Sequence, residues 1–437
     1  MSRWRCSLDV TLTYAGQDVA LDLRGGELAT MISLPPAPAA SLDLASLIER
    51  AIENPVGTPP LGRLAGPGKR VAVLFDDGSR PTPTSLLFPL VEKELLKCGV
   101  SSDHIYPVHA PGLHRMPARY LQAKAGELLK HPNLVMHDEH KSRTVFRGVT
   151  TYGNPIFVND IVERVDLVMS IGNIVPHMDA GYGGGGKIVL PGISAKPTVE
   201  QNHSFFTSPT SRMRITDGNP AREDMDQAGR LAGLDFIVNT ITDLGGRIAD
   251  VVAGDAIAAH RQGVACKEEI CGYWLDEPVD IAVAAGDNPF LIGTMGMMML
   301  AELAVRPGGS LILASPCSDG WSPPDMLEVG MHPPLEYMRR SMAEMAWMVA
   351  NRGAPENRLS AWIFDYRRVM EEKHVYLVNR RFDRSDVESF GMHWAPDIQS
   401  AFDAALECHG AGAKVAIFPN GSRVIPIVRR GRVHPSP

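Results

Sequence analysis

The sequence predicts an α/β fold of two α/β domains with largely parallel sheets, and an active-site cleft between the domains. Two series of apolar, strand-like runs alternate with helical patterns, one in each half of the chain. Such alternation is typical of a parallel sheet with crossover helices. Continuous apolar runs such as VAVLF at 71–75 are typical of strands that are buried on both faces. The length of 437 residues also exceeds that of one ordinary domain.

The first series follows a β-hairpin near the N-terminus. Alternating residues at 10–23 predict the two strands of this hairpin, with the turn at Ala15-Gly16. A proline-rich connector at 34–38 and a helix near 43–53 come next. A strand, a helix, a strand, a helix and a strand are then expected, in this order, at 69–77, 85–99, 104–110, 117–130 and 166–172.

The second series restarts after a boundary that we place at 265–278. Its strands are expected at 279–286, 310–317, 374–379 and 414–421, and its helices at 293–309, 333–351 and 397–410. We therefore assign residues 1–268 to an N-terminal domain with the site motifs and 278–420 to a C-terminal domain that closes over the site. Residues 421–437 form a tail, for which a return to the N-terminal domain is one option.

Composition and charge argue against several classes of protein. The chain is 44% hydrophobic and 21% charged, which is the profile of a globular protein. Its formal charge of −7 is spread along the chain, so the sequence does not predict a nucleic-acid partner or binding to an anionic membrane. No apolar run approaches the length of about 20 residues that a membrane helix needs. We expect a cytoplasmic protein and leave homo-oligomer formation open.

A glycine run at 179–192, DAGYGGGGKIVLPG, matches the spelling of a phosphate-binding P-loop. Gly181, Gly186 and Lys187 fit G-x-x-x-x-G-K. In a P-loop the next residue is Ser or Thr, whose hydroxyl binds magnesium, but here it is Ile188. The run therefore serves another purpose than triphosphate hydrolysis.

Two loops after predicted strands carry polar side chains that could bind or turn over a small acid. In FDDGSRPTP at 75–83, Arg80 suits a substrate carboxylate, because its planar guanidinium can bind one bidentately. An alternative is that Asp77 and Arg80 pair only to stiffen this loop. In HAPGLHRMP at 109–117, His114 could act as an acid or a base near neutral pH. A merely solvated histidine is the alternative there, and His109 is the weaker candidate.

The glycine run itself adds two more candidates, His177 and Lys187. Four successive glycines at 183–186 let the backbone approach a ligand closely, and the lysine beside them could bind phosphate or become a nucleophile. An ordinary flexible loop is the alternative. The spacing of His203 favours its interpretation as a structural histidine. The charged surroundings of HDEH at 137–140 favour an exposed connection over a pair of metal ligands.

Together these stretches resemble the nickel-pincer lactate racemase family. The resemblance rests on four motifs that agree in order and spacing: DDGSRPTP at 76–83, GLHRMP at 112–117, PHMDAGYGGGGK at 176–187 and QNH at 201–203. It spans nearly the whole chain, including the division into two domains.

The resemblance implies a cofactor, a nickel-pincer nucleotide, which is a pyridinium mononucleotide with two sulfur-bearing arms. It implies that Lys187 holds this nucleotide covalently as a thioamide and that His203 is a nickel ligand. Asp77, Gly185 and Gly186 would seat the cofactor. The enzymes that build the cofactor would then be needed as partners for activation.

The resemblance also implies an activity, that of an isomerase which inverts C2 of a 2-hydroxy acid by proton-coupled hydride transfer. His114 and His177 would stand on opposite faces of the substrate, and Arg80 would anchor its carboxylate. The lactate enzymes carry a Gln and a Lys near the start of the second domain, where this chain has Gly296 and Met299. This departure predicts a substrate other than lactate, either a larger 2-hydroxy acid or a sugar acid.

Two other functions are compatible with the residues alone. One is a cofactor-free lyase or isomerase that uses the same histidines. The other is a module that binds a nucleotide or phosphate through Gly183–Lys187 without chemistry.

Overall fold

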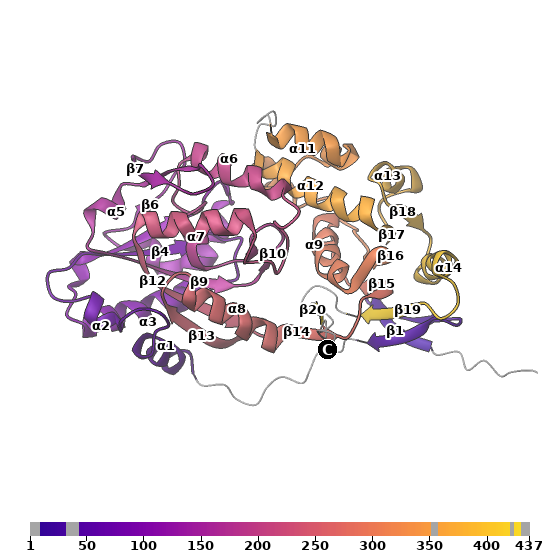
Figure 1. Ribbon diagram of the computed structural model, residues 1–437, viewed down its shortest axis with the longest axis horizontal. Helices are drawn as coiled ribbons and strands as arrows, with labels where there is room; N and C mark the ends of the chain where they lie inside the picture. The colour runs from indigo at the N-terminus through magenta and orange to yellow at the C-terminus, as the bar shows by residue number, and fades with distance from the viewer. Residues whose placement is uncertain (1–8, 32–42, 351–356, 420–423, 430–437) are drawn as a thin grey trace, which may run out of the picture.

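The computed structural model describes residues 9–31, 43–350, 357–419 and 424–429. Figure 1 shows two lobes side by side, one drawn mainly from indigo to pink and the other mainly in orange and yellow. Each lobe is built on a six-stranded sheet with helices on both faces. The predicted fold class, two α/β units with largely parallel sheets, is confirmed.

The sheet of the first lobe has the order β13-β12-β9-β4-β5-β6. Only β13 runs antiparallel to its neighbour; the other pairings are parallel. The strands span Val71–Asp76 (β4), Ile105–Ala110 (β5), Val135–Met136 (β6), Leu167–Ile174 (β9), Leu234–Thr242 (β12) and Ile248–Gly254 (β13).

Strand β4 shows how this sheet separates two apolar cores. Val71, Val73 and Phe75 face a core shared with α1 and α3, whereas Ala72 and Leu74 face a core shared with α7 and α8. Successive side chains of a strand point to opposite faces, so a continuous apolar run serves both cores. The helices of the lobe are Leu44–Glu53 (α1), Leu61–Leu64 (α2), Thr84–Lys97 (α3), Ala118–Ala125 (α4), Ile161–Arg164 (α5), Lys196–Ser204 (α6), Pro220–Ala232 (α7) and Ala258–Cys271 (α8).

Short strand pairs complete the first lobe. A hairpin of β7 (Thr144–Val149) and β8 (Pro155–Asn159) lies outside the main sheet. The two-residue strands β10 (Pro176–His177) and β11 (Gly181–Tyr182) pair antiparallel, and they frame the loop that leads into the glycine run.

The sheet of the second lobe has the order β18-β17-β16-β15-β19-β3, and all its pairings are parallel. Its strands span Glu27–Met31 (β3), Val279–Ala285 (β15), Val305–Ala314 (β16), His374–Val378 (β17), His393–Ala395 (β18) and Lys414–Phe418 (β19). Its helices span Leu291–Ala301 (α9), Pro324–Glu328 (α10), Met342–Ala350 (α11), Asn357–Glu372 (α12), Arg384–Ser389 (α13) and Ile398–His409 (α14).

The first residues of the described chain belong to the second lobe, which corrects the assignment of 1–268 to one domain. The predicted hairpin forms, as β1 (Asp9–Tyr14) and β2 (Gln17–Asp22), but it packs with the second sheet, and β3 pairs with β19. Figure 1 shows β1 in indigo beside β19 in yellow. The hairpin has too little apolar surface for a core of its own, and Leu12 and Leu21 become fully buried against Ile281 and Val283.

The expected boundary, 265–278, includes the end of a helix and a short strand. Helix α8 continues to Cys271 and leads directly into β14 (Gly272–Leu275). Strand β20 (Ile425–Val428), in the expected tail, pairs in parallel with β14. Both strands contribute to an apolar core that extends from Ile241 in the first sheet to the helices of the second lobe, so the tail returns to the junction between the lobes.

Two expected helices of the second half are shorter than the patterns indicated. The helix expected at 293–309 ends at Ala301, because β16 already begins at Val305. The helix expected at 333–351 is divided into a short 3₁₀ segment, Leu335–Arg339, and α11. The connector at 34–38 lies outside the described residues.

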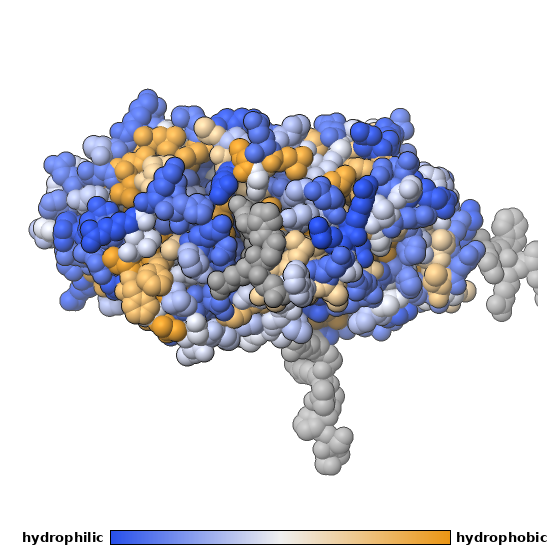
Figure 2. All heavy atoms as spheres, turned by 90° about the horizontal axis from the view of Figure 1, so that it is seen from above, coloured by the Kyte–Doolittle hydropathy of each residue, from blue (hydrophilic) through white to orange (hydrophobic). Residues whose placement is uncertain are grey.

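In the described part of the chain, no helix combines the length and the apolar composition that crossing a bilayer requires. On the face shown in Figure 2, hydrophilic side chains predominate and apolar side chains gather in separate patches.

Candidate active site

Loops that follow three parallel strands converge at one edge of the first sheet. β4 ends at Asp76, β5 at Ala110 and β9 at Ile174. Since parallel strands present their carboxyl ends at the same edge, the loops after them meet. They line a narrow cavity of about 50 Å³, the glycine-loop cavity. Its lining includes Asp77, Arg80, His114, Asn173, Gly183–Gly185, Lys187 and Asn239.

Asp77 holds His114 in a defined orientation. His114 Nδ1 donates to Asp77 Oδ2 at 2.6 Å, and the Ser79 N–H donates to Asp77 Oδ1 at 2.6 Å. Burial alone would raise the pKa of the Asp77 carboxyl, but His114, Arg80 and the Ser79 side chain outweigh it and hold this pKa well below its usual range. Asp77 is therefore ionised, and in neutral His114 the lone pair that accepts a proton lies on Nε2.

Arg80 shares a cavity with His114 and contacts the other predicted histidine, His177. Its loop is fixed because Lys124 Nζ donates to the Arg80 carbonyl at 3.0 Å and forms an ion pair with Asp76 at 2.5 Å. The Arg80 guanidinium reaches the imidazole of His177, with 3.4 Å between Nη2 and Nε2. The alternative that Arg80 only stiffens its loop is not supported by this contact, which lies on another loop.

His177 lies on β10, and its side chain is about as exposed as that of His114, at 10% against 12%. The N–H groups of Asp179 and Ala180 point at its Nδ1, at 3.3 Å and 3.4 Å. Burial, followed by the nearby charges of Lys187 and Arg80, lowers the pKa of His177 well below its usual value. His177 is therefore neutral at neutral pH, with one nitrogen that carries a proton and one that accepts.

Lys187 is buried at the closed end of the glycine run, in a 3₁₀ turn at Gly185–Ile188. Burial is the main cause that lowers the pKa of its ammonium to about 7, and Arg80 and Arg222 act in the same direction. A substantial fraction of the amine is therefore unprotonated near neutral pH, which is the form that attacks a carbon centre.

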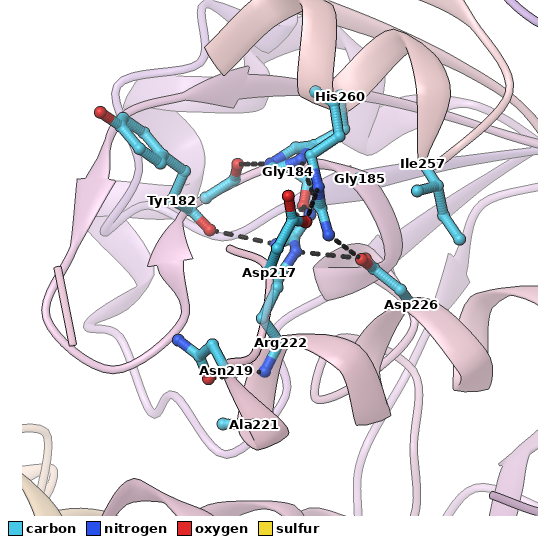
Figure 3. Close-up of polar contacts among 12 residues, drawn as sticks. Tyr182, Gly184, Gly185, Asp217, Asn219, Ala221, Arg222, Asp226, Ile257 and His260 are labelled. Carbon is cyan, nitrogen blue, oxygen red and sulfur yellow. Dashed lines mark hydrogen bonds and ion pairs between the residues drawn. The ribbon is translucent and has the colours of Figure 1, made fainter. Parts of the chain in front are cut away.

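A buried arginine holds the glycine run from behind (Figure 3). Arg222, on α7, donates to the carbonyls of Tyr182 and Gly184 at 3.1–3.2 Å and pairs with Asp226 at 3.1 Å. Beside it, His260 Nε2 donates to the carbonyl of Gly183 at 2.9 Å. These contacts fix the backbone of the loop, so its cavity side keeps one shape.

Three glycines of this run are also packed closely against other parts of the protein. At Gly185 (φ +60°) a Cβ would lie 2.5 Å from Arg222 Nη2, and at Gly184 (φ +80°) it would lie 2.7 Å from Asn239 Oδ1. At Gly186 it would lie 2.5 Å from the carbonyl oxygen of Met225. The peptide backbone of Gly183–Gly185 nevertheless lines the cavity.

Two predicted site residues lie outside the lining of the cavities described here. Gly186 packs against α7, as above. His203, on α6, is buried with its ring 4.5 Å from the ring of Phe206. It still belongs to the same electrostatic neighbourhood, because its charge lowers the pKa of His177.

Two carboxyl groups, one from each lobe, lie close together next to His177. Asp179 and Asp365, on α12, are both buried and interact with each other. Burial is the main cause that raises the pKa of Asp179 to about 6, and burial together with Asp179 raises the pKa of Asp365 well above its usual value. Two carboxylates cannot share a buried site unless one is protonated, so the pair holds a proton at neutral pH. Arg368 Nε lies 3.5 Å from Asp365.

A larger cavity of about 550 Å³ adjoins Arg80 and His177 and lies between the lobes. We call it the methionine cavity, because methionines from both lobes line it. Besides Arg80 and His177, its lining includes Met178, Met213, Lys267, Gly293, Gly296, Met297, Met299, Leu300 and Trp362. The expected interdomain site therefore has residues from both lobes.

A third cavity, of about 510 Å³, lies on the other side of His114, and we call it the histidine cavity. Contrary to the expectation of an exposed connection at 137–140, His137 is buried: its Nε2 donates to the Ser194 carbonyl at 3.2 Å. His109 is also buried, which lowers its pKa to about 4. Among the described residues, no group of three or more His, Cys, Asp or Glu side chains is arranged to hold a metal ion.

The residue patterns did not indicate several side chains of this site. Arg222, His260 and Asn239 support the glycine run, and Asp179 and Asp365 pair across 186 positions of the chain, the difference between their numbers. The only local signal was Asn219-Pro220, a strong helix start that places Arg222 in the first turn of α7.

Comparison with known sequences gives the family. Residues 14–214 match the family model of the lactate racemase N-terminal domain, and residues 291–426 match that of the lactate racemase C-terminal domain. The chain belongs to the lactate racemase family. It is 27% identical over 430 residues to a lactate racemase of Thermoanaerobacterium thermosaccharolyticum, covering 95% of this chain and 99% of that protein. It is 28% identical over 390 residues to a lactate racemase of Lactiplantibacillus plantarum, covering 86% and 90%.

Solved structures agree with this family. The lactate racemase apoprotein of Thermoanaerobacterium thermosaccharolyticum superimposes with a TM-score of 0.80 at 25% identity, covering 96% of this chain and all of that one. A protein of Thermotoga maritima superimposes with a TM-score of 0.60 at 18% identity, covering 90% of this chain and 100% of that one, and shares the fold. Membership of the family makes this protein an isomerase of the racemase type that acts on a small molecule.

Proposed function

We propose that the protein inverts C2 of a 2-hydroxy acid other than lactate, with a nickel-pincer nucleotide attached to Lys187. The observation that carries the proposal is the arrangement of His114 and His177 around Arg80. The two histidines come from different loops, and Arg80 lines both the glycine-loop cavity and the methionine cavity. When a hydride leaves and returns at C2, the hydroxyl oxygen must lose and regain a proton on opposite faces of the substrate, and two independently held histidines can supply this.

Arg80 would bind the carboxylate of the substrate. Both nitrogens of His177 face N–H donors, from Arg80 on one side and from the backbone of Asp179 and Ala180 on the other. A neutral imidazole has only one acceptor nitrogen, so His177 cannot accept hydrogen bonds from the donors on both sides. One of these donors therefore needs another acceptor. A substrate carboxylate on Arg80 would supply the missing acceptor.

His114 and His177 would exchange roles as base and acid with the direction of the reaction. Asp77 stabilises the protonated form of His114, which favours removal of the hydroxyl proton at Nε2. His177 is held neutral by burial and by the cations around it, which makes its protonated form a strong acid. Each histidine is expected to contribute about 10²–10⁴-fold to the rate.

The residues around Lys187 fit the implied cofactor. The amine has a pKa of about 7, as attachment to a carbonyl-type carbon requires. In the cavity wall, Asn173 Oδ1 is buried and meets no donor among the described residues, so a bound ligand could satisfy it. The imidazole of His203 is a suitable nickel ligand. The glycine-loop cavity alone is too small for a nucleotide, but it shares Asp77 and His114 with the histidine cavity.

Lys187 and His203 would hold the nickel-pincer group, whose chemistry when bound is that of a reversible hydride acceptor for C2. Asp77, Gly185 and Gly186 would support the group, Gly185 through its backbone in the cavity wall. Activation would depend on the enzymes that build the cofactor. Family membership weighs against a module without chemistry and against a cofactor-free lyase.

The proposal is tested by intact-protein and peptide mass spectrometry, with nickel quantified in parallel. The protein is co-expressed with cofactor-building enzymes, and a lactate racemase from the same cells serves as the positive control. We expect an adduct of nucleotide mass on the Lys187 peptide together with bound nickel. Lys187→Ala is expected to lose the adduct and all racemase activity, because it removes the attachment point.

The matched control is Lys196→Ala, which removes a partly exposed lysine that lies 3.7 Å from Glu200. It is expected to retain the adduct. A bare Lys187 peptide without nickel, from cells in which the positive control is loaded, would contradict the proposal.

A further inference from the structure

The methionine cavity has no assigned occupant in the residue roles above. It opens beside Arg80 and His177, and thus beside the place where a substrate carboxylate and C2 would lie. Its volume of about 550 Å³ falls within the range of about 300–1,000 Å³ that is usual for small-molecule sites. The methyl group of lactate would leave most of this space to water.

The walls of this cavity are mostly apolar. Met178 and Met213 come from the first lobe, and Met297, Met299 and Leu300 come from α9 of the second lobe. Figure 1 shows α9 on the side of the second lobe that faces β10. Methionine side chains are flexible and polarisable, so they adapt to an aromatic or branched group.

Trp362, on α12, adds an aromatic surface to the same wall. Its indole ring lies 5.8 Å from the imidazole of His332, measured between ring centroids. This contact fixes an aromatic face against which an apolar side chain could pack.

Two charged residues of the lining, Lys267 and Asp243, already bond neighbouring residues. Lys267 Nζ donates to the carbonyl of Thr242 at 2.6 Å and to its hydroxyl at 3.3 Å. Asp243 accepts from the Arg247 guanidinium at 2.7–2.9 Å. A sugar acid would lose hydrogen bonds to water here and gain few in return, which disfavours a polyhydroxylated side chain.

Gly296 gives a second, independent indication. It lies within α9, where glycine weakens a helix relative to alanine. A Cβ at this position would meet no atom within 4 Å, so packing does not require glycine. At Gly293, in contrast, a Cβ would lie 2.9 Å from Asn288 Oδ1. Gly296 is exposed and lines the cavity, so a larger side chain at this position would take up open space at the cavity wall.

We propose that the substrate is a 2-hydroxy acid with a large apolar side chain, aromatic or branched, which occupies the methionine cavity while Arg80 holds the carboxylate. This inference rests on the proposed function for the reaction at C2, but its binding part is independent of the cofactor.

The test compares substrates on the cofactor-loaded enzyme and ligands on the apoprotein. We would measure kcat/KM for racemisation of 3-phenyllactate, 2-hydroxyisocaproate, lactate, malate and gluconate. Because burial of extra apolar groups in a pocket changes selectivity by about 10–200-fold, we expect the first two acids to exceed lactate by about that factor. Calorimetry on the apoprotein should show tighter binding of 3-phenyllactate than of lactate.

Gly296→Leu places a side chain in the open space of the cavity. It is expected to lower the ratio of kcat/KM for 3-phenyllactate over lactate by about 10-fold or more. Gly296→Ala, which also favours the helix, should shift the ratio in the same direction by less. Gly66→Leu is the matched control, because a Cβ at Gly66 also meets no atom within 4 Å but lies in the first lobe, near α2. It should leave the ratio unchanged.

The outcomes separate this inference from the proposed function. If the loaded enzyme racemises lactate, malate or gluconate better than the apolar acids, the inference is overturned and the proposed function stands. If the loaded enzyme racemises none of the acids, the proposed function fails. In that case, binding of 3-phenyllactate that Gly296→Leu weakens supports the apolar cavity, and absence of binding overturns it.

Discussion

Two loops of the site each carry a predicted catalytic histidine, but they control the state of this histidine in different ways. His114 is controlled by direct contact, because its Nδ1 bonds the ionised carboxylate of Asp77 at 2.6 Å. His177 is controlled by its surroundings. Burial and nearby cations keep it neutral. Arg222 supports the glycine run that follows it, and the carboxyl pair of Asp179 and Asp365 lies next to it.

This difference predicts which substitutions affect activity and which affect stability. Removing the direct partner of His114 should impair the chemistry most strongly. Removing a support of the His177 loop should first lower the free energy of unfolding. The predictions below test this contrast, starting with the largest expected effect.

Asp77→Asn should lower kcat/KM by about 10²–10⁴-fold, because the amide cannot hold the proton on His114 Nδ1 as the carboxylate does. The melting temperature should also fall, because an ionised carboxylate with a lowered pKa stabilises the fold at neutral pH, so activity and stability are measured separately. Activity is compared at equal nickel content, so that a loss of cofactor is not mistaken for a loss of acid-base function. Normal activity of a fully loaded Asp77→Asn enzyme would break the comparison.

Arg222→Met should lower the free energy of unfolding by about 3 kcal/mol or more, because it leaves carbonyls of the glycine run and part of the Asp226 charge unpaired in the interior. Arg230→Met, at an exposed position of the same helix, is the control and should have little effect. Chemical denaturation measures both. Equal stability of the two variants would mean that the glycine run needs no support from behind.

The carboxyl pair predicts a smaller effect that depends on pH. The pKa of Asp179 is raised to about 6 in the folded protein, above its value of about 3.9 in an unfolded chain. A raised carboxyl pKa stabilises the fold below the unfolded value, and this contribution is lost as the pH rises through about 6. The groups that face the pair are Lys187, Arg80, Arg368, Glu302 and Tyr366.

Asp365→Asn should remove most of this dependence, because an amide can donate to an ionised Asp179 at any pH. We expect the stability difference between the wild type and the variant to change by about 1–3 kcal/mol between pH 4.5 and pH 7.5. Denaturation curves at several pH values measure it. A difference that stays constant across this range would show that the two carboxyls do not share a proton.

The parts of the site that could be predicted follow from local patterns. Asp77, Arg80 and His114 were found because parallel strands end at one edge and the loops after them meet there. The P-loop spelling drew attention to Lys187, and its next residue excluded a triphosphatase. These inferences need only a few neighbouring residues each.

The remaining parts depend on contacts between distant segments, which a single sequence does not encode in any short pattern. In the sequence, Asp365 resembles an ordinary polar residue of a helix. Its role becomes visible only in the folded protein, where α12 packs against the His177 loop. HDEH reads as exposed, yet His137 is buried by the Ser194 region. The glycines 184–186 predict a close approach to a ligand, and only the folded protein shows that their missing Cβ atoms also face Asn239, Arg222 and Met225.

The position of β3 has a consequence for the order in which the chain can be completed during synthesis. Its strand partner, β19, emerges from the ribosome almost 390 residues later, from Glu27 to Lys414. Contacts so distant in sequence form slowly, since a long loop has to close first. The first lobe can fold while the N-terminal hairpin waits, and the second lobe closes only when the last strand of its sheet arrives. A ribosome that stalls before β19 would therefore release a chain with one finished lobe and an unpaired N-terminal strand.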